Sequence, residues 1–445
     1  MRAPRSSAPG YFRFGEDATC FGRTAGHQPA HSPNASLHDA SGDVRIERGR
    51  VTLPFDPCEV ADHLRLENYA GVRGSGSSSL IARLYYLLRP LLPVPVRRHL
   101  QKFRLRNWDQ LPFPHWPVDF SVDVMMESLL LAASRALGRP IPFIWFWPQG
   151  HSACILLTHD VEQMAGRDFC GNLMNLDAAH GFGASFQIIP EKRYPVSPEF
   201  LDSIRARGFE VAVHDLNHDG HLYRDRAEFL RRVEKINEYR RSFEAEGFRA
   251  GILYRNQEWF DALEFSYEMS VPNVAHLDPQ RGGCCTVMPY FIGKLLEIPV
   301  TTVQDYTLFN ILGDFSIDLW QKQTRLILDR HGLMSFIIHP DYVIDPRNRA
   351  VFESLLAYLA TLVKEEGVWS TTPGKLNRWW RERSAMQLVQ RDGAWRIEGF
   401  GSERARIAWA SEENGRLTLT LEDREYDPAT WTEPVFGPRA RQANG

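Results

Sequence analysis

From about residue 150 to residue 370, short apolar runs alternate with longer amphipathic stretches. The runs are predicted to be strands, because they are too short for helices and are bounded by polar turn residues. They are Cys154–Thr158, Ala184–Ile189, Phe209–His214, Gly251–Tyr254, Leu295–Val300 and Met334–His339. The helical period is clearest at Ala227–Glu246, Ser316–Arg330 and Asn348–Glu366. Buried strands that alternate with helices indicate βα units and a parallel sheet or barrel, whose active site lies at the C-terminal ends of the strands.

The sequence on both sides of this region has a different texture, and a length of 445 residues suggests two or three domains. Before it, the expected elements are short strands at Tyr11–Phe14 and Val51–Leu53 and helices near 58–70, 79–89 and 121–136. After it, strand-like runs separated by the dipeptides Asp392-Gly393 and Asn414-Gly415 predict antiparallel hairpins. The expected segments are an irregular N-terminal segment at 1–45, a mixed α/β region at 46–149, a catalytic domain at 150–384 and a small antiparallel β appendage at 385–445.

Charge and composition exclude some classes of partner. The 52 Lys and Arg residues nearly balance the 55 Asp and Glu residues, for a net charge of -3, so no nucleic-acid partner is expected. The six cysteines form no CxxC pair, which fits a reducing compartment. The first 20 residues contain no long apolar segment, so we expect no signal peptide and a cytoplasmic location, possibly at the inner face of the membrane.

The segment Ile81–Trp108 is the reason that the inner face of the membrane is a possible location. It contains seven Lys or Arg residues and no acidic residue among Leu, Tyr and Phe, a composition that suits peripheral contact with an anionic membrane surface. Pro90, Pro93 and Pro95 interrupt any continuous amphipathic face, which favours a helix that packs on the core with its arginines in solvent. Both interpretations stay open.

The first candidate site residues directly follow the run CILL. In Thr158-His159-Asp160-Val161-Glu162, the alternation of an extended strand puts Asp160 and Glu162 on the same side. Two neighbouring carboxylates resist simultaneous ionisation unless a cation lies between them, which favours a metal ligand beside a general base. A solvated loop with two exposed acids is the alternative.

The second candidate follows the run FEVAV. His214 and His218 are four residues apart, so they can meet on one side of a helical turn and share a metal ion. His221 is a possible substitute ligand. This spacing also arises by chance among 15 histidines. Indeed, His27 and His31 show it in a proline-containing segment with no strand before it, and we assign no function to that pair.

Three further polar residues follow predicted strands. His339 ends the run SFII and suits general-acid work on a departing amine, because its ordinary pKa lies near neutrality. Arg255 follows GILY and Asp305 follows LEIPVTTV. An arginine beside a catalytic carboxylate would keep it ionised and oriented, and a surface salt bridge is the competing interpretation for each residue.

Taken in order, these motifs resemble a known family. The series THDVE, HDLNH, YRN, QDY and IIHPDY is similar to the five-motif order of the NodB-homology polysaccharide deacetylases, carbohydrate esterase family 4. The resemblance covers about residues 150–383 and includes the closing segment Trp369–Trp379. It implies an irregular (β/α) barrel of about seven strands and hydrolysis of an N-acetyl group with one divalent metal ion, for which zinc is expected.

The resemblance also implies roles for individual residues. Asp160 matches the catalytic base, Arg255 the arginine that orients it, Asp305 an acidic member of that network and His339 the general acid. The metal ligands would be Glu162, His214 and His218. Most members of the family have adjacent aspartates or D-x-D, whereas this chain has the longer Glu162 after Val161, and Arg255-Asn256-Gln257 lacks the usual proline. The exchange of roles between Asp160 and Glu162 therefore stays open.

The function that this resemblance implies is release of acetate from an N-acetylated amino sugar, either in a polysaccharide or in its lipid- or nucleotide-linked precursor. Two alternatives remain. The first is a catalytically silent module that binds sugar or a partner protein, which the departure at Glu162 would suit. The second is a hydrolase of a non-sugar amide, as in allantoinase-like relatives.

Overall fold

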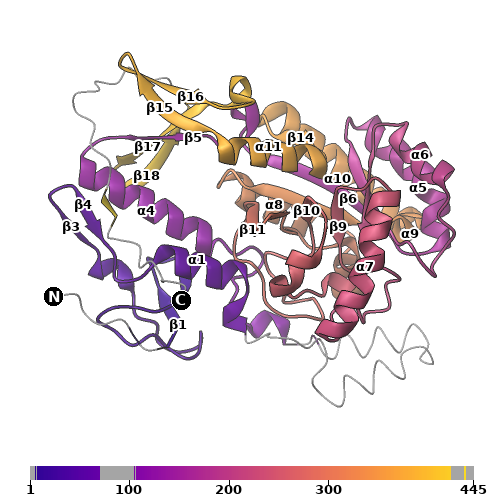
Figure 1. Cartoon of the computed structure of the whole chain (residues 1–445), viewed down its shortest axis with the longest axis horizontal. Helices are drawn as coiled ribbons and strands as arrows, with labels where there is room; N and C mark the ends of the chain where they lie inside the picture. The colour runs from indigo at the N-terminus through magenta and orange to yellow at the C-terminus, as the bar shows by residue number, and fades with distance from the viewer. Residues whose placement is uncertain (1–5, 7, 71–104, 106, 422–434, 437–445) are drawn as a thin grey trace. The chain divides into compact units, whose positions relative to one another are not determined.

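A computed structural model describes residues 6, 8–70, 105, 107–421 and 435–436 (Figure 1). The chain divides into two compact units. The barrel unit contains Ala70–Asp119 and His151–Arg378, and the second unit, here called the composite unit, contains Met1–Tyr69, Phe120–Gly150 and Trp379–Gly445.

The barrel unit is built on one curled sheet whose strands run in the order β11-β12-β10-β9-β8-β7-β6-β13, with β14 also paired to β6. All neighbours are parallel except β11 and β12. The eight parallel strands are β6 (Cys154–Val161), β7 (Ala184–Ile188), β8 (Glu210–His214), β9 (Gly247–Arg249), β10 (Tyr267–Glu268), β12 (Leu295–Glu297), β13 (Leu333–Ile338) and β14 (Trp369–Thr371); the antiparallel one is β11 (Tyr290–Ile292). The expected parallel βα fold is confirmed, with eight parallel strands where about seven were expected.

The barrel is irregular because side chains replace part of the strand pairing. In the segment after β12, the hydroxyl groups of Thr301 and Thr302 donate to the backbone carbonyls of Leu333 and Ser335 on β13, at 2.6 and 2.8 Å. Thr301 Oγ1 also accepts from the Ser335 amide at 2.9 Å. These bonds satisfy backbone groups of β13 that have no ladder partner there.

Helices follow most of these strands (Figure 1). Those of the barrel unit are α5 (Met164–Ala179), α6 (Pro198–Arg205), α7 (Arg226–Ser242), α8 (Asp318–Leu328), α9 (Pro340–Val343) and α10 (Pro346–Glu365), and α11 (Pro373–Ala385) begins in it. The local sequence explains where several of these helices begin. Ser197, Asp225 and Asp345 accept hydrogen bonds from amides in the first turns of α6, α7 and α10.

One expected strand lies elsewhere. Gly251–Leu253, inside the strand expected at Gly251–Tyr254, is the 3-10 helix η6, and Ile252 and Leu253 have positive φ angles of 63° and 53°. Left-handed residues cannot continue a strand. The strand is instead β9, whose last residue is Arg249. The two-residue strand β10 was not expected, because so short a run has no readable period.

The composite unit combines the two ends of the chain. Strand β5 (Ile141–Ile144) pairs with β17 (Ile407–Glu413), which pairs with β18 (Arg416–Thr420). Helix α4 (Ser121–Leu137) packs on this sheet through a small core that includes Ala133, Ile141 and Ala410. The expected C-terminal strands are therefore present, but they join residues 120–150 rather than standing apart.

Several smaller elements complete the composite unit. They are the hairpins β1 (Gly10–Arg13) with β2 (Thr19–Gly22), β3 (Arg45–Glu47) with β4 (Arg50–Thr52) and β15 (Gln387–Arg391) with β16 (Ala394–Glu398), the parallel strand β19 (Val435–Phe436) beside β4, and helix α1 (Pro57–Arg65). The expected turns at Asp392-Gly393 and Asn414-Gly415 have positive φ at both residues, as type I′ hairpin turns require.

The basic segment at 81–108 falls almost wholly outside the described residues. Leu105, which is described, is buried in a cluster with Leu277 and Ile311. Within the described ranges, no helix combines the length and apolar character that a bilayer crossing requires.

Candidate active site

Two carboxylates lie at the C-terminal end of β6. Asp160 is buried within the strand, and Glu162 follows its last residue, Val161. The alternation of the strand turns both carboxylates toward His214, whose Nε2 lies 3.7 Å from Asp160 Oδ2 and 4.0 Å from Glu162 Oε1. The Glu162 side chain is 24% exposed against 4% for Asp160, so Glu162 is the group that solvent reaches more easily.

Two histidines come from the end of β8 and the turn after it. His214 is the last residue of β8, and His218 lies in a turn rather than on the helical turn that its spacing suggested. Asp215 and His218 have positive φ angles of 56° and 55°, a conformation that strains non-glycine residues and often marks functional sites. The turn brings the two rings to 5.0 Å between centroids and places His218 Nε2 2.9 Å from Glu162 Oε1.

Glu162, His214 and His218 fit a metal ion. One ligand atom from each lies within 4.8 Å of the other two. In a tetrahedral zinc site, bonds of 2.0–2.2 Å put ligand atoms about 3.4 Å apart, which lies between the observed 2.9 and 4.0 Å. Both Nε2 atoms are buried and make no hydrogen bond. His214 Nδ1 is hydrogen-bonded to the backbone carbonyl of Arg249 at 3.1 Å, which leaves Nε2 as the ligating atom.

The arginine that contacts Asp160 is Arg249, at the end of β9. Its Nη1 donates to Asp160 Oδ1 at 2.6 Å and to Thr158 Oγ1 at 2.9 Å, and its side chain is fully buried. Burial would raise the pKa of Asp160, but Arg249 and then His214 outweigh burial and hold that pKa below its usual value. Asp160 is thus an ionised carboxylate with a fixed orientation.

Arg255, which the sequence assigned to this role, is placed differently. Its Nη1 donates to the carbonyl of Leu253 at 3.0 Å, and its backbone amide donates to Gln280. The assignment to Arg255 is corrected to Arg249 because the strand ends five residues earlier than its apolar run suggested. With β9 located correctly, the rule that site residues follow strands would have selected Arg249.

His339 lies after β13 and is held by Asp305. Asp305 is fully buried; its Oδ1 lies 2.6 Å from His339 Nδ1, and its Oδ2 accepts from the His339 amide at 2.7 Å. His339 Nε2 is 3.5 Å from Glu162 Oε1. Burial alone would lower the pKa of His339, but Asp305 and then Glu162 outweigh it and raise that pKa well above its usual value. A protonated imidazole therefore stands beside the metal-ligand cluster.

Two other residues of these motifs lie outside this group. His159 is buried on the opposite side of β6, where its Nε2 lies 2.8 Å from Asp177 Oδ2. His221 is 46% exposed at its side chain and approaches Asp219 at 3.6 Å. Neither residue belongs to the metal-ligand cluster.

A pair of buried carboxyl groups was not anticipated. Glu268 and Glu297 are neighbours across β10 and β12, and both are fully buried. Glu268 accepts from the Ser270 amide at 2.8 Å, and Glu297 Oε1 accepts from the Val271 amide at 3.1 Å. Burial and then the charge of Glu268 raise the pKa of Glu297 well above its usual value, and burial also raises the pKa of Glu268, so the pair holds a proton that we assign to Glu297. No sequence pattern marks this pair, because its members are 29 positions apart.

No protein-family model and no curated protein matches the chain. Solved structures with a similar fold include polysaccharide deacetylases and members of carbohydrate esterase family 4. A structure described as a "putative polysaccharide deacetylase from Mycobacterium smegmatis" has 17% identity and a TM-score of 0.45, over 56% of this chain and 98% of its own.

Two further structures are similar at the same level. For the allantoinase described as "Puue Allantoinase", the identity is 13% and the TM-score 0.41, over 53% of this chain and 92% of that one. For the peptidoglycan deacetylase PdaC from Bacillus subtilis, the identity is 14% and the TM-score 0.33, over 53% of this chain and 95% of that one. At these values, the likeness does not identify the reaction.

Proposed function

We propose that the barrel unit hydrolyses the N-acetyl group of an amino sugar and releases acetate, with one divalent metal ion held by Glu162, His214 and His218. The observation that carries the proposal is the convergence of three groups at the same ends of parallel strands. These are the metal-ligand cluster, an ionised Asp160 fixed by Arg249, and a protonated His339 fixed by Asp305.

The metal, zinc in our proposal, would polarise the acetyl carbonyl and make water more acidic. Asp160 is suited to take the proton of the attacking water. Its Oδ1 is occupied by Arg249, whereas its Oδ2 faces His214 at 3.7 Å, on the side of the metal-ligand cluster. A carboxylate that stays ionised can serve as the general base as long as its pKa lies below the working pH.

His339 is suited to protonate the departing amine. Its Nδ1 is bound to Asp305, so its Nε2 is the atom that points toward Glu162 and delivers the proton. The raised pKa keeps the ring protonated near neutral pH, which an acid catalyst of amide cleavage needs. The base and the acid therefore differ in charge because their buried partners differ, Arg249 for one and Asp305 for the other.

Acetate release tests this proposal. The purified full chain with one equivalent of Zn²⁺ should release acetate from N-acetylglucosamine oligosaccharides, and His214→Ala/His218→Ala should lose both the activity and the metal of this site. His221→Ala is the matched control, because that exposed histidine lies in the same segment and should leave both unchanged. Cleavage of allantoin but of no N-acetyl sugar would favour the non-sugar hydrolase. Metal binding without cleavage of either substrate would favour the silent module.

We further propose that the enzyme acts in the cytoplasm on a biosynthetic precursor, such as a lipid- or nucleotide-linked N-acetyl sugar. The six cysteines, which form no CxxC pair, and the basic segment at 81–108 motivate this proposal. Cell fractionation followed by a high-salt wash of the membranes tests it. Recovery of the protein outside the cytoplasmic membrane would contradict it.

A further inference from the structure

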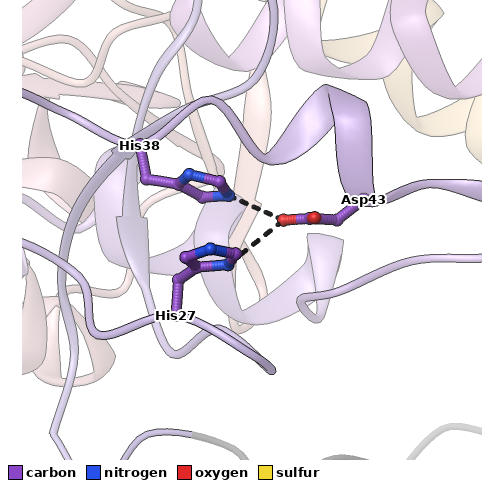
Figure 2. Close-up of side chains that lie close together, drawn as sticks. All are labelled: His27, His38 and Asp43. Atoms are coloured by element: carbon purple, nitrogen blue, oxygen red, sulfur yellow. Dashed lines mark hydrogen bonds and ion pairs between the residues drawn. The ribbon is translucent and has the colours of Figure 1, made fainter.

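A second cluster of metal-ligating side chains lies in the composite unit. It consists of His27, His38 and Asp43, and the two histidines approach the same carboxylate oxygen of Asp43 (Figure 2). His38 Nε2 lies 2.6 Å and His27 Nδ1 3.5 Å from Asp43 Oδ2. The two rings stack with their centroids 3.6 Å apart and their planes at 16°, so their nitrogens reach the same carboxylate side by side.

The backbone holds each of the three residues in place. Thr24 Oγ1 donates to the carbonyl of His27 at 2.6 Å, and the carbonyl of His38 accepts from the Arg13 amide on β1 at 2.8 Å. Asp43 ends the 3-10 helix η1 (Ala40–Asp43), which Asp39 caps by accepting from the Ser41 amide. The cluster is thus presented by ordered segments that follow β2 and precede β3.

We propose that His27, His38 and Asp43 form a second metal site, which takes a zinc-like transition-metal dication. Two imidazoles and one carboxylate suit zinc and its neighbours, whereas calcium and magnesium prefer sites made of oxygen ligands. The 3.5 Å between His27 Nδ1 and Asp43 Oδ2 is close to the roughly 3.4 Å between ligands in a tetrahedral zinc site. A metal ion lies in the plane of each imidazole that binds it, so the two stacked rings have to rotate out of their nearly parallel arrangement and the His38 contact has to lengthen.

Comparison with the barrel site supports this assignment. Among the residues that the structure describes, these are the two groups whose ligand atoms meet within 4.8 Å. In both groups, one imidazole nitrogen lies within 3 Å of the carboxylate and the other lies 3.5–4.0 Å away. The side chains of the second site are 33–49% exposed, so water can complete the coordination and the ion can enter from solvent.

The site would act as a cross-link rather than a catalyst. It joins positions 27, 38 and 43, in a part of the composite unit whose strands are three or four residues long. Binding to the folded state but not to the unfolded chain stabilises a protein by mass action. The protein would then hold two metal ions, one in each unit, and the second would be independent of the proposed deacetylation.

The test uses the full chain carrying His214→Ala/His218→Ala, which removes the barrel site. Isothermal titration with Zn²⁺ should still show one equivalent bound, and Zn²⁺ should raise the melting temperature. Adding His38→Ala should weaken this binding at least roughly tenfold, because one of three protein ligands is gone. His31→Ala is the matched control: His31 is exposed, lies four residues from His27 and is outside the cluster, so binding should not change.

Asp43→Asn is the second variant, since it keeps the shape of the side chain while weakening the ligand. In the otherwise natural chain, it should reduce the zinc content from two equivalents to one and leave acetate release unchanged. Two results would overturn the proposal: no saturable zinc binding in the His214→Ala/His218→Ala protein, or binding there that survives both His38→Ala and Asp43→Asn.

Discussion

Arg249 connects the proposed base to a metal ligand: its guanidinium donates to Asp160 at 2.6 Å, and its backbone carbonyl is hydrogen-bonded to His214 Nδ1. Both contacts follow from β9 lying beside β8, with Arg249 directly opposite His214. One residue therefore fixes the charge of the base and the orientation of a metal-ligating imidazole.

The first prediction concerns this arginine. Arg249→Lys should move the acid limb of the kcat/KM profile to higher pH. Arg249 holds the pKa of Asp160 down, activity falls as Asp160 becomes protonated, and a higher pKa brings that loss on at a higher pH. Arg255→Lys is the control and should leave the acid limb in place. A shift caused by Arg255→Lys alone would restore the role that the sequence gave it.

The second prediction separates the two carboxylates. Asp160→Asn should keep the metal and lower kcat by roughly 10²–10⁴, the usual loss when a general base is removed. Glu162→Gln should lose metal, because a neutral amide is a poorer ligand, and excess Zn²⁺ should partly restore its activity. Zinc content and acetate release measured on both proteins check this. Loss of metal from Asp160→Asn with retention by Glu162→Gln would show that the roles are exchanged.

The third prediction concerns the acid. Asp305→Asn removes the charge that most raises the pKa of His339, so that pKa should fall. Since His339 must be protonated to act, the alkaline limb of the kcat/KM profile should move to lower pH. His339→Ala should abolish this limb and reduce kcat while retaining the metal. An unchanged alkaline limb in Asp305→Asn would mean that another group supplies the proton.

The fourth prediction concerns stability. Glu297 has a raised pKa in the folded protein, so the folded state holds a proton that the unfolded chain releases near pH 4.5, and stability falls as pH rises through the interval between these two pKa values. Glu297→Gln has no such proton, and its amide can still donate to Glu268. Its melting temperature should match that of the natural protein at pH 4 and exceed it at pH 8.

The expected difference in melting temperature depends on the size of the protein, and Glu268→Gln provides the control. For a chain of 445 residues, each kcal/mol corresponds to about 1 °C in melting temperature, because the unfolding entropy grows with chain length. Glu268→Gln should destabilise the protein at every pH, because both carboxylate oxygens of Glu268 accept hydrogen bonds that an amide nitrogen cannot accept. Equal behaviour of the two variants would contradict the assignment of the proton to Glu297.

Local sequence alone determined the βα alternation and which residues follow its strands. The runs before Asp160, His214 and His339 are mostly apolar because those strands are buried on both faces. Alternation within a strand also fixed that Asp160 and Glu162 face the same way. These features depend on neighbours in the chain, and periodicity records them directly.

Only the tertiary structure decided which distant residues meet. The three-residue strand β9 has too few positions for a period, and its pairing with β8 selected Arg249 over Arg255. The pairing of β5 with β17 joined the C-terminal strands to residues 120–150, and the loop after β2 brought His27 to His38 and Asp43 rather than to His31. Such contacts depend on how the backbone closes over many residues. The local pattern that identifies a strand contains no information about which strand will lie beside it or what a loop will reach.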